Sequence, residues 1–150
     1  MSVLDWSPEK RILVEVRKAL NGARRTRRST NFATLFPTVL PDDLEVGQGE
    51  SICAEIRNKH GRRFYFTERG MYVETDGFFA HLPYESIVRC DWIDDDPDLT
   101  VKARKKQEHG DRLILHDSER KRYELDGLGS AFQGMYMFFH WLKERRRTAG

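Results

Sequence analysis

Two groups of basic side chains are the residues best suited to bind a charged ligand. They are Arg24, Arg25, Arg27 and Arg28 in the first group, and Lys59, Arg62 and Arg63 in the second. Such side chains donate charge-assisted hydrogen bonds to phosphate, so both groups are candidate sites for an anionic lipid or a nucleic acid. Each group also has a simpler interpretation. The first group would be part of a linker, and the second would be a solvated turn. We favour these, because surface charge often serves only solvation.

Metal binding and catalysis have no comparable support in the sequence. The aspartate-rich run from Asp94 to Asp98 lacks the spaced acids, central glycine and terminal glutamate of a calcium loop. The histidines have no ligand spacing with one another, or with Cys53 and Cys90, which predict buried thiols rather than a disulfide. No serine or cysteine lies in a glycine-flanked nucleophile turn, and no phosphate-binding glycine motif occurs. We therefore expect a protein without enzymatic activity, metal or cofactor.

Length and composition indicate one globular domain with a terminal extension. The chain has 150 residues, of which 39% are hydrophobic and 33% are charged. Its net charge of +2 is too small to indicate a nucleic-acid partner unless the basic groups gather on one face. No apolar run reaches the roughly 18 to 20 residues that span a bilayer, and the N-terminus lacks the order of a secretory signal. We expect a cytoplasmic protein without a transmembrane segment.

The N-terminal region, residues 1–49, predicts an amphipathic helix followed by a basic, proline-containing linker. The run Ser7–Glu9 is a typical helix start, and apolar residues then recur at helical spacing as far as Leu20. The pair Asn21–Gly22 favours a left-handed exit that ends the helix. The arginine-rich residues 23–31 are therefore predicted to be a linker.

From residue 50 onward the spacing of apolar residues changes to the period of two that indicates β-strands. Turns that contain glycine, of which Asp76–Gly77 is the clearest, separate the segments as in a series of hairpins. The predicted strands are 52–56, 64–66, 71–74, 78–82, 87–93, 99–105, 112–116 and 122–125. We expect residues 50–150 to form the main domain, with mainly β structure and an α+β content overall.

A C-terminal helix is predicted from about Ser130 to Arg146. One stripe of this helix is apolar at helical spacing and is expected to pack on the sheet. That stripe consists of Phe132, Met135, Tyr136, Phe139 and Leu142. The other side of the helix carries a second apolar set, namely Met137, Phe138 and Trp141. One sheet cannot cover both sides, so this second surface needs another partner.

Two kinds of partner fit this second surface. The favoured one is the N-terminal helix folding back with its own apolar face, which includes Ile12 and Val16. The alternative is a second copy of the chain or a foreign protein. The candidate partner-binding residues are therefore Met137, Phe138, Trp141, Ile12 and Val16.

Two runs, Phe64–Val73 and Leu82–Ile87, carry a family resemblance. An aromatic strand ends in threonine, a turn and an apolar strand follow, and a Pro-Tyr-x-x-Ile run enters a later strand. This pattern resembles bacterial pleckstrin-homology (PH) and GRAM-type domains over roughly residues 50–146. The resemblance implies a bent antiparallel sheet or barrel of about seven to eight strands, capped by a C-terminal helix. Lipid-binding PH domains close their basic hairpin motif with an arginine, whereas Phe64 and Tyr65 occupy those positions here.

The function expected from these features is that of a non-enzymatic interaction module of PH-like fold. It is expected to dock a protein partner, or itself, through a sheet edge or through the second surface of the C-terminal helix. The alternative is an electrostatic binder of anionic lipid or nucleic acid that uses the two arginine-rich segments.

Overall fold

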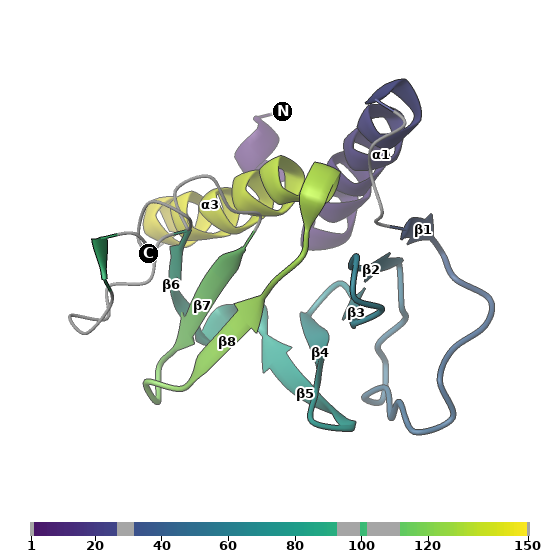
Figure 1. Cartoon of the computed structure of the whole chain (residues 1–150). Coiled ribbons are helices and arrows are strands. Elements are labelled where there is room, and N and C mark those ends of the chain that lie inside the picture. Colours follow the sequence, from purple (N-terminus) through teal and green to yellow (C-terminus); the bar gives the residue numbers. More distant parts are fainter. Residues whose placement is uncertain (1, 27–31, 93–99, 102–111, 150) are drawn as a thin grey trace.

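The computed structural model describes residues 2–26, 32–92, 100–101 and 112–149 (Figure 1). Its architecture is α+β, with antiparallel strands in two sheets and a C-terminal helix. The helices, with η for 3-10 helices, are η1 (Val3–Asp5), α1 (Pro8–Thr26), η2 (Tyr84–Ser86), η3 (Gly129–Ala131) and α3 (Phe132–Ala149). The strands are β1 (Phe32–Leu35), β2 (Ala54–Arg57), β3 (Arg63–Phe66), β4 (Gly70–Thr75), β5 (Phe78–Pro83), β6 (Ile87–Asp91), β7 (Leu113–Asp117) and β8 (Arg122–Leu125). The predicted strand 99–105 lies largely outside the described residues.

Helix α1 begins where the sequence predicts and ends later. The Oγ atom of Ser7 accepts a hydrogen bond from the backbone N–H of Lys10 at 3.2 Å, which caps the first turn. The predicted end at Asn21–Gly22 is wrong, because α1 continues for another turn. Alanine and arginine, which follow this pair, are good helix formers, and the pair itself costs only about 1 to 2 kcal/mol inside a helix. Arg24 and Arg25 therefore lie in α1 rather than in a linker.

Strands β1 to β5 form one antiparallel sheet in chain order. Ile56, Phe64 and Val73 lie opposite one another on neighbouring strands and are fully buried on the face that meets the helices. Tyr65 and Tyr72 lie opposite each other on the other face, as expected for the alternation of side chains along a strand. The predicted alternation in this part of the chain is thus confirmed.

The loop between β1 and β2 explains why the second face of this sheet is also covered. Figure 1 shows this long loop running beside the five-stranded sheet. The Tyr72 hydroxyl accepts a hydrogen bond from the backbone N–H of Gly47 at 2.9 Å and donates one to Glu50 at 2.6 Å. These bonds tie the loop to β4, so Tyr72 is buried although it faces away from the helices.

Strand β1 joins the N-terminal region to the main sheet, which the sequence pattern does not predict. Ala33 of β1 lies opposite Ile56 of β2 at the edge of the sheet. A strand of four residues is too short to show a clear period. Ile12 and Val16 of α1 belong to the same hydrophobic core as the sheet. The predicted domain boundary at residue 50 therefore does not separate two packing units.

The second sheet has the strand order β6-β7-β8, with a register shift between Ile87 and Arg89. The described strands do not close into a barrel, because no hydrogen-bonded ladder joins this sheet to the five-stranded one. The connection explains the break. After Pro83 the chain makes the 3-10 turn η2 before β6 begins, so β5 and β6 are not joined by a tight hairpin turn.

Helix α3 packs against β6 and against α1, and Figure 1 shows the two long helices above the sheets. The ring of Phe138 makes edge-to-face contacts with Phe66 of β3 and with Tyr84 of η2, with centroids 6.3 and 5.3 Å apart. Gly134 allows a close approach of the two helices, since a β-carbon at this position would lie 3.0 Å from the carbonyl oxygen of Glu15. This side of α3 is therefore part of the core.

Candidate binding groove between β6 and α3

The candidate site lies at the outer edge of the three-stranded sheet. Strand β6 pairs with β7 on one side, and no strand among the described residues pairs with its other side. The outward N–H and C=O groups of an edge strand are open to pairing with another chain. Val88 leaves the regular alternation at the register shift, and 52% of its surface is exposed. The edge thus presents an apolar side chain beside backbone polar groups.

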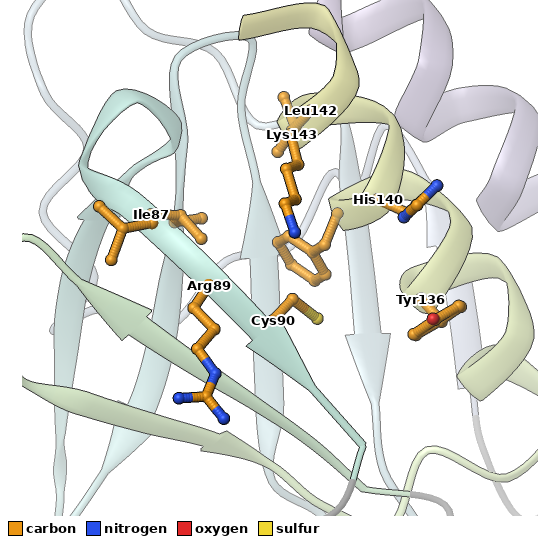
Figure 2. Close-up of a pocket in the computed structure, with 9 residues that line it drawn as sticks. Ile87, Arg89, Cys90, Tyr136, His140, Leu142 and Lys143 are labelled. Atoms are coloured by element: carbon orange, nitrogen blue, oxygen red, sulfur yellow. The ribbon is translucent and has the colours of Figure 1, made fainter. Parts of the chain in front are cut away.

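A cavity of about 220 Å³ lies between this edge and α3 (Figure 2). We call this cavity, together with the outer edge of β6, the β6–α3 groove. The cavity is lined by Ile87, Val88, Arg89, Cys90, Tyr136, Phe139, His140, Leu142 and Lys143. Its lining combines buried apolar side chains from both elements with polar groups near the opening, which is the usual composition of a ligand pocket.

A row of stacked rings along α3 contributes to one wall of the groove. The rings of Tyr136 and His140 stack with centroids 6.2 Å apart and an angle of 12° between their planes. Phe132 stacks on Tyr136 in the same way, at 6.4 Å and 15°. These residues are spaced by one helical turn, so they share one face of α3. The row offers flat apolar surface to a side chain that enters the groove.

The charged side chains among the described lining residues of the groove are basic. Lys143 extends from α3 toward Cys90 in Figure 2, whereas Arg89 points away from the helix. Arg89 Nε lies 2.5 Å from a carboxylate oxygen of Asp91, which is also 3.4 Å from His116 Nε2. The described lining residues include no acid. Lys143 therefore remains as a cation that no acid in the lining neutralises.

Cys90 contributes shape rather than reactivity to the groove. The pKa of the Cys90 thiol is raised to about 12, mainly by burial and also by the charge of Asp91, whereas the charge of Lys143 lowers it. A thiol with this pKa is protonated at neutral pH, and only the thiolate is a good nucleophile. The structure gives no support for covalent catalysis at this cysteine.

Arg146 covers the beginning of the β6 edge. Its guanidinium donates hydrogen bonds to the backbone carbonyls of Ile87 and Glu85. The carbonyl of Ile87 is thus already paired with a side chain of this chain. The part of the edge left for another strand begins after this residue.

The second predicted basic group is not a free anion site. The guanidinium of Arg62 donates to the backbone carbonyls of Glu74 and Glu124 and to the carboxylate of Asp126, the last at 2.9 Å. Arg63 pairs with the carboxylate of Glu74 at 2.5 Å. Hydrogen bonding and charge from Arg63 lower the pKa of Glu74. Anion binding by these two arginines stays a prediction, and an external anion would have to compete with acceptors of this chain that already bind most of their N–H groups.

The remaining predicted anion-binding residues are not gathered into one site by the structure. Lys59 lies in the exposed turn between β2 and β3 and has interactions of its own. Arg24 and Arg25 lie near the end of α1, and Arg27 and Arg28 fall outside the described residues.

The predicted partner surface is largely internal. Phe138 and Trp141 are 0% and 4% exposed, and Ile12 and Val16 of α1 are fully buried. The indole N–H of Trp141 donates to the carbonyl of Val3 at 3.1 Å, so η1 also contacts this side of α3. The candidate docking role of these four residues is corrected, because the N-terminal region of the same chain covers them. Only Met137, 37% exposed, lies at the surface.

Sequence reasoning missed the groove because its residues come from two distant segments. The expected core stripe of α3 includes Tyr136 and Phe139, which line the groove as well as facing the sheet. The only signal was the run from Ile87 to Cys90, whose irregular alternation is compatible with a bulge at an edge strand.

Two wider hollows have weaker features. One of about 440 Å³ between β5 and β8 contains Arg62, whose guanidinium already donates to Glu74, Glu124, Asp126 and Thr75. The other, of about 480 Å³, lies beside Glu50, Glu68 and His81. Within the described ranges, no three side chains of the kinds that bind metals are placed to hold an ion.

Comparisons with protein-family models, curated proteins and solved structures found no significant match to this chain. None of the helices in the described part combines the length and apolar character needed to cross a bilayer. The function of the chain is therefore inferred from the geometry of the groove.

Proposed function

We propose that this chain is a non-enzymatic protein-interaction module of the PH-like kind, which docks an extended segment of a protein partner in the β6–α3 groove. The observation that carries the proposal is the cavity that lies beside an edge of β6 with which no described strand pairs. A segment that adds to a strand edge gains affinity from backbone hydrogen bonds and specificity from pockets for its side chains. The groove offers both.

The order of elements supports the family part of the proposal. Strands β2 to β5 and β6 to β8 pair antiparallel with their chain neighbours, and α3 follows them. The Pro-Tyr-x-x-Ile run forms the end of β5, the turn η2 and the start of β6. Tyr84 in this run is buried, and its hydroxyl donates to the carbonyl of Thr67 at 2.7 Å. Helix α1 is the N-terminal helix expected before this order, and strand β1 is an addition to it.

Substitution of the edge residue tests the proposal. Short random peptides displayed on phage are selected on the whole chain, and the binders are mapped by amide chemical shifts of the labelled protein. We expect the shifts to lie in β6 and α3. Val88→Asp should weaken these peptides about tenfold or more, because a charge at the edge opposes strand addition.

Val39→Asp is the matched control, since Val39 is also an exposed valine, 82% accessible, in the loop between β1 and β2. It should leave peptide affinity unchanged. Equal weakening by both substitutions, shifts confined to other elements, or a selection that yields no binder would each contradict the proposal.

The alternative of an electrostatic lipid or nucleic-acid binder loses one of its two basic groups, because Arg62 and Arg63 are paired within the chain. Its main support is then the group Arg24, Arg25, Arg27 and Arg28, with Lys59 left from the second group. Binding to anionic liposomes or oligonucleotides at low salt, lost when these arginines are replaced by glutamine, is the result that would favour it.

A further inference from the structure

We infer that the β6–α3 groove selects an acidic segment, in which an aspartate or glutamate meets Lys143 and a neighbouring apolar side chain enters the cavity. This inference rests on the proposed function, since it names the chemistry of the segment that the groove would dock. It follows from the charge, shape and open length of the groove.

The charge of the lining is one-sided. Arg89, His140 and Lys143 are the ionisable basic residues of the lining, and the described lining residues include no carboxylate. Asp91 balances Arg89 at 2.5 Å, but it lies outside the lining. No ion pair within the described ranges involves Lys143. A partner that brings a carboxylate completes this balance, whereas a basic partner meets repulsion.

Basic residues near a helix C-terminus also have a simpler role, because they interact favourably with the helix dipole. Arg145 and Arg147, in the last turns of α3, fit that role. Arg145 also lies over the ring of Trp141, at 5.2 Å from its centroid. Lys143 differs from them, because Figure 2 shows its side chain turned toward β6. Its influence on the pKa of the Cys90 thiol places its charge at the groove.

The apolar part of the groove supplies the second requirement. Ile87, Phe139 and Leu142 are buried side chains that also line the cavity. A volume of about 220 Å³ corresponds to roughly seven water molecules at about 30 Å³ each. This is room for one large apolar side chain. Residues two positions apart in a strand share one face, so the acidic residue that meets Lys143 and the apolar residue that enters the cavity are expected at positions i and i+2.

Arg146 limits where the segment lies. Because its guanidinium occupies the carbonyl of Ile87, a docked strand is expected to pair with the edge from Val88 to Asp91. Lys143 lies one helical turn before Arg146 on α3, and Figure 2 shows its side chain turned toward Cys90, which belongs to this open stretch. The groove therefore fits a short acidic segment.

The charge of selected peptides tests the inference. Peptides selected from a random phage library on the whole chain, and mapped to β6 and α3 by chemical shifts, should be enriched in aspartate and glutamate. Raising the salt from about 50 mM to about 300 mM should weaken them several-fold. In the tightest-binding peptide, each acidic residue is replaced in turn by its amide. At the position that meets Lys143, this replacement should lower the affinity about threefold to tenfold.

A double-mutant cycle assigns that effect to Lys143. K143Q should lower the affinity for the acidic peptide by a similar factor. It should also remove the difference in affinity between the glutamate and glutamine peptides. K121Q, at an exposed lysine beside the β7–β8 turn, is the control and should change neither affinity. Unchanged thermal unfolding of both variants excludes a folding defect. Persistence of the peptide difference in K143Q overturns the assignment.

The two proposals fail differently. Groove-mapped peptides that are neutral or basic overturn the acidic preference and leave the docking function standing. The absence of any groove-mapped peptide overturns both.

Discussion

The side chain of Arg62 shows how a residue selected for charge can serve structure instead. Arg62 directly precedes β3, and its guanidinium donates hydrogen bonds to backbone carbonyl groups on β4 and β8. The planar guanidinium suits this task, because its donors lie in a fixed fork. Arg62 thereby joins two sheets whose described strands share no hydrogen-bonded ladder.

At this scale we predict that Arg62→Ala lowers the free energy of unfolding by about 2 to 4 kcal/mol, because it leaves carbonyls and Asp126 without their charged donor. Arg62→Lys should recover only part of this loss. Urea unfolding at neutral pH provides the measurement. Arg57→Ala is the control and should cost no more than about 0.5 kcal/mol, since Arg57 is exposed and 4.0 Å from Glu55. An equal loss of stability in the Arg62→Ala and Arg57→Ala proteins would contradict the structural role assigned to Arg62.

The pairing of α1 with α3 depends on close approach at one glycine. Sequence spacing predicted the two helices and their apolar faces, and the favoured partner for the second face of α3 was α1. It could not predict which turns meet, because the crossing of two helices depends on their side chains together. The carbonyl of Glu15 lies where a side chain at position 134 would begin.

We predict that Gly134→Ala destabilises the chain by about 1 to 3 kcal/mol, although alanine is a better helix former by about 1 kcal/mol. The added β-carbon would lie 3.0 Å from a backbone oxygen, so α1 and α3 must move apart. Gln133→Ala, at the exposed neighbouring position on α3, should be neutral or slightly stabilising. Thermal unfolding followed by circular dichroism compares them. A Gly134→Ala protein as stable as the Gln133→Ala protein would show that the helices are not packed this closely.

The whole molecule has one core to which the N-terminal region contributes. Ile12 and Val16 are buried with residues of both sheets and of α3. The chain therefore gains its stability from contacts that join its first and last elements. We expect unfolding to be a single cooperative transition.

Ile12→Ala tests this, and we predict a loss of about 2 to 4 kcal/mol, because it leaves a cavity between α1 and the rest of the core. The transitions followed by tryptophan fluorescence and by circular dichroism should coincide. Val39→Ala, at an exposed position, should change stability by no more than about 0.5 kcal/mol. Separate transitions for the two probes would indicate that the N-terminal helix folds as an independent unit.

Local pattern alone determined much of this protein. The period of two predicted most of the strands, the period of 3.6 predicted both long helices, and the glycine turns separated the hairpins. These features depend on residues within a few positions of one another. The end of α1 was mispredicted, because a favourable local exit at Asn21–Gly22 is overridden by the helix formers that follow.

Other features became visible only in the folded chain. These are the division into two sheets, the addition of β1 and the groove between β6 and α3. The hydrogen bonds of Arg62 within the chain and the burial of Phe138 and Trp141 belong to the same group. Each depends on contacts between segments far apart in the sequence. The type of a side chain determines which groups it can interact with. Which acceptor or apolar surface lies next to it depends on how the whole chain folds. For that reason Arg62 and Arg63 of the β2–β3 hairpin bond to acceptors of this chain, and the candidate site lies where the edge of β6 meets α3.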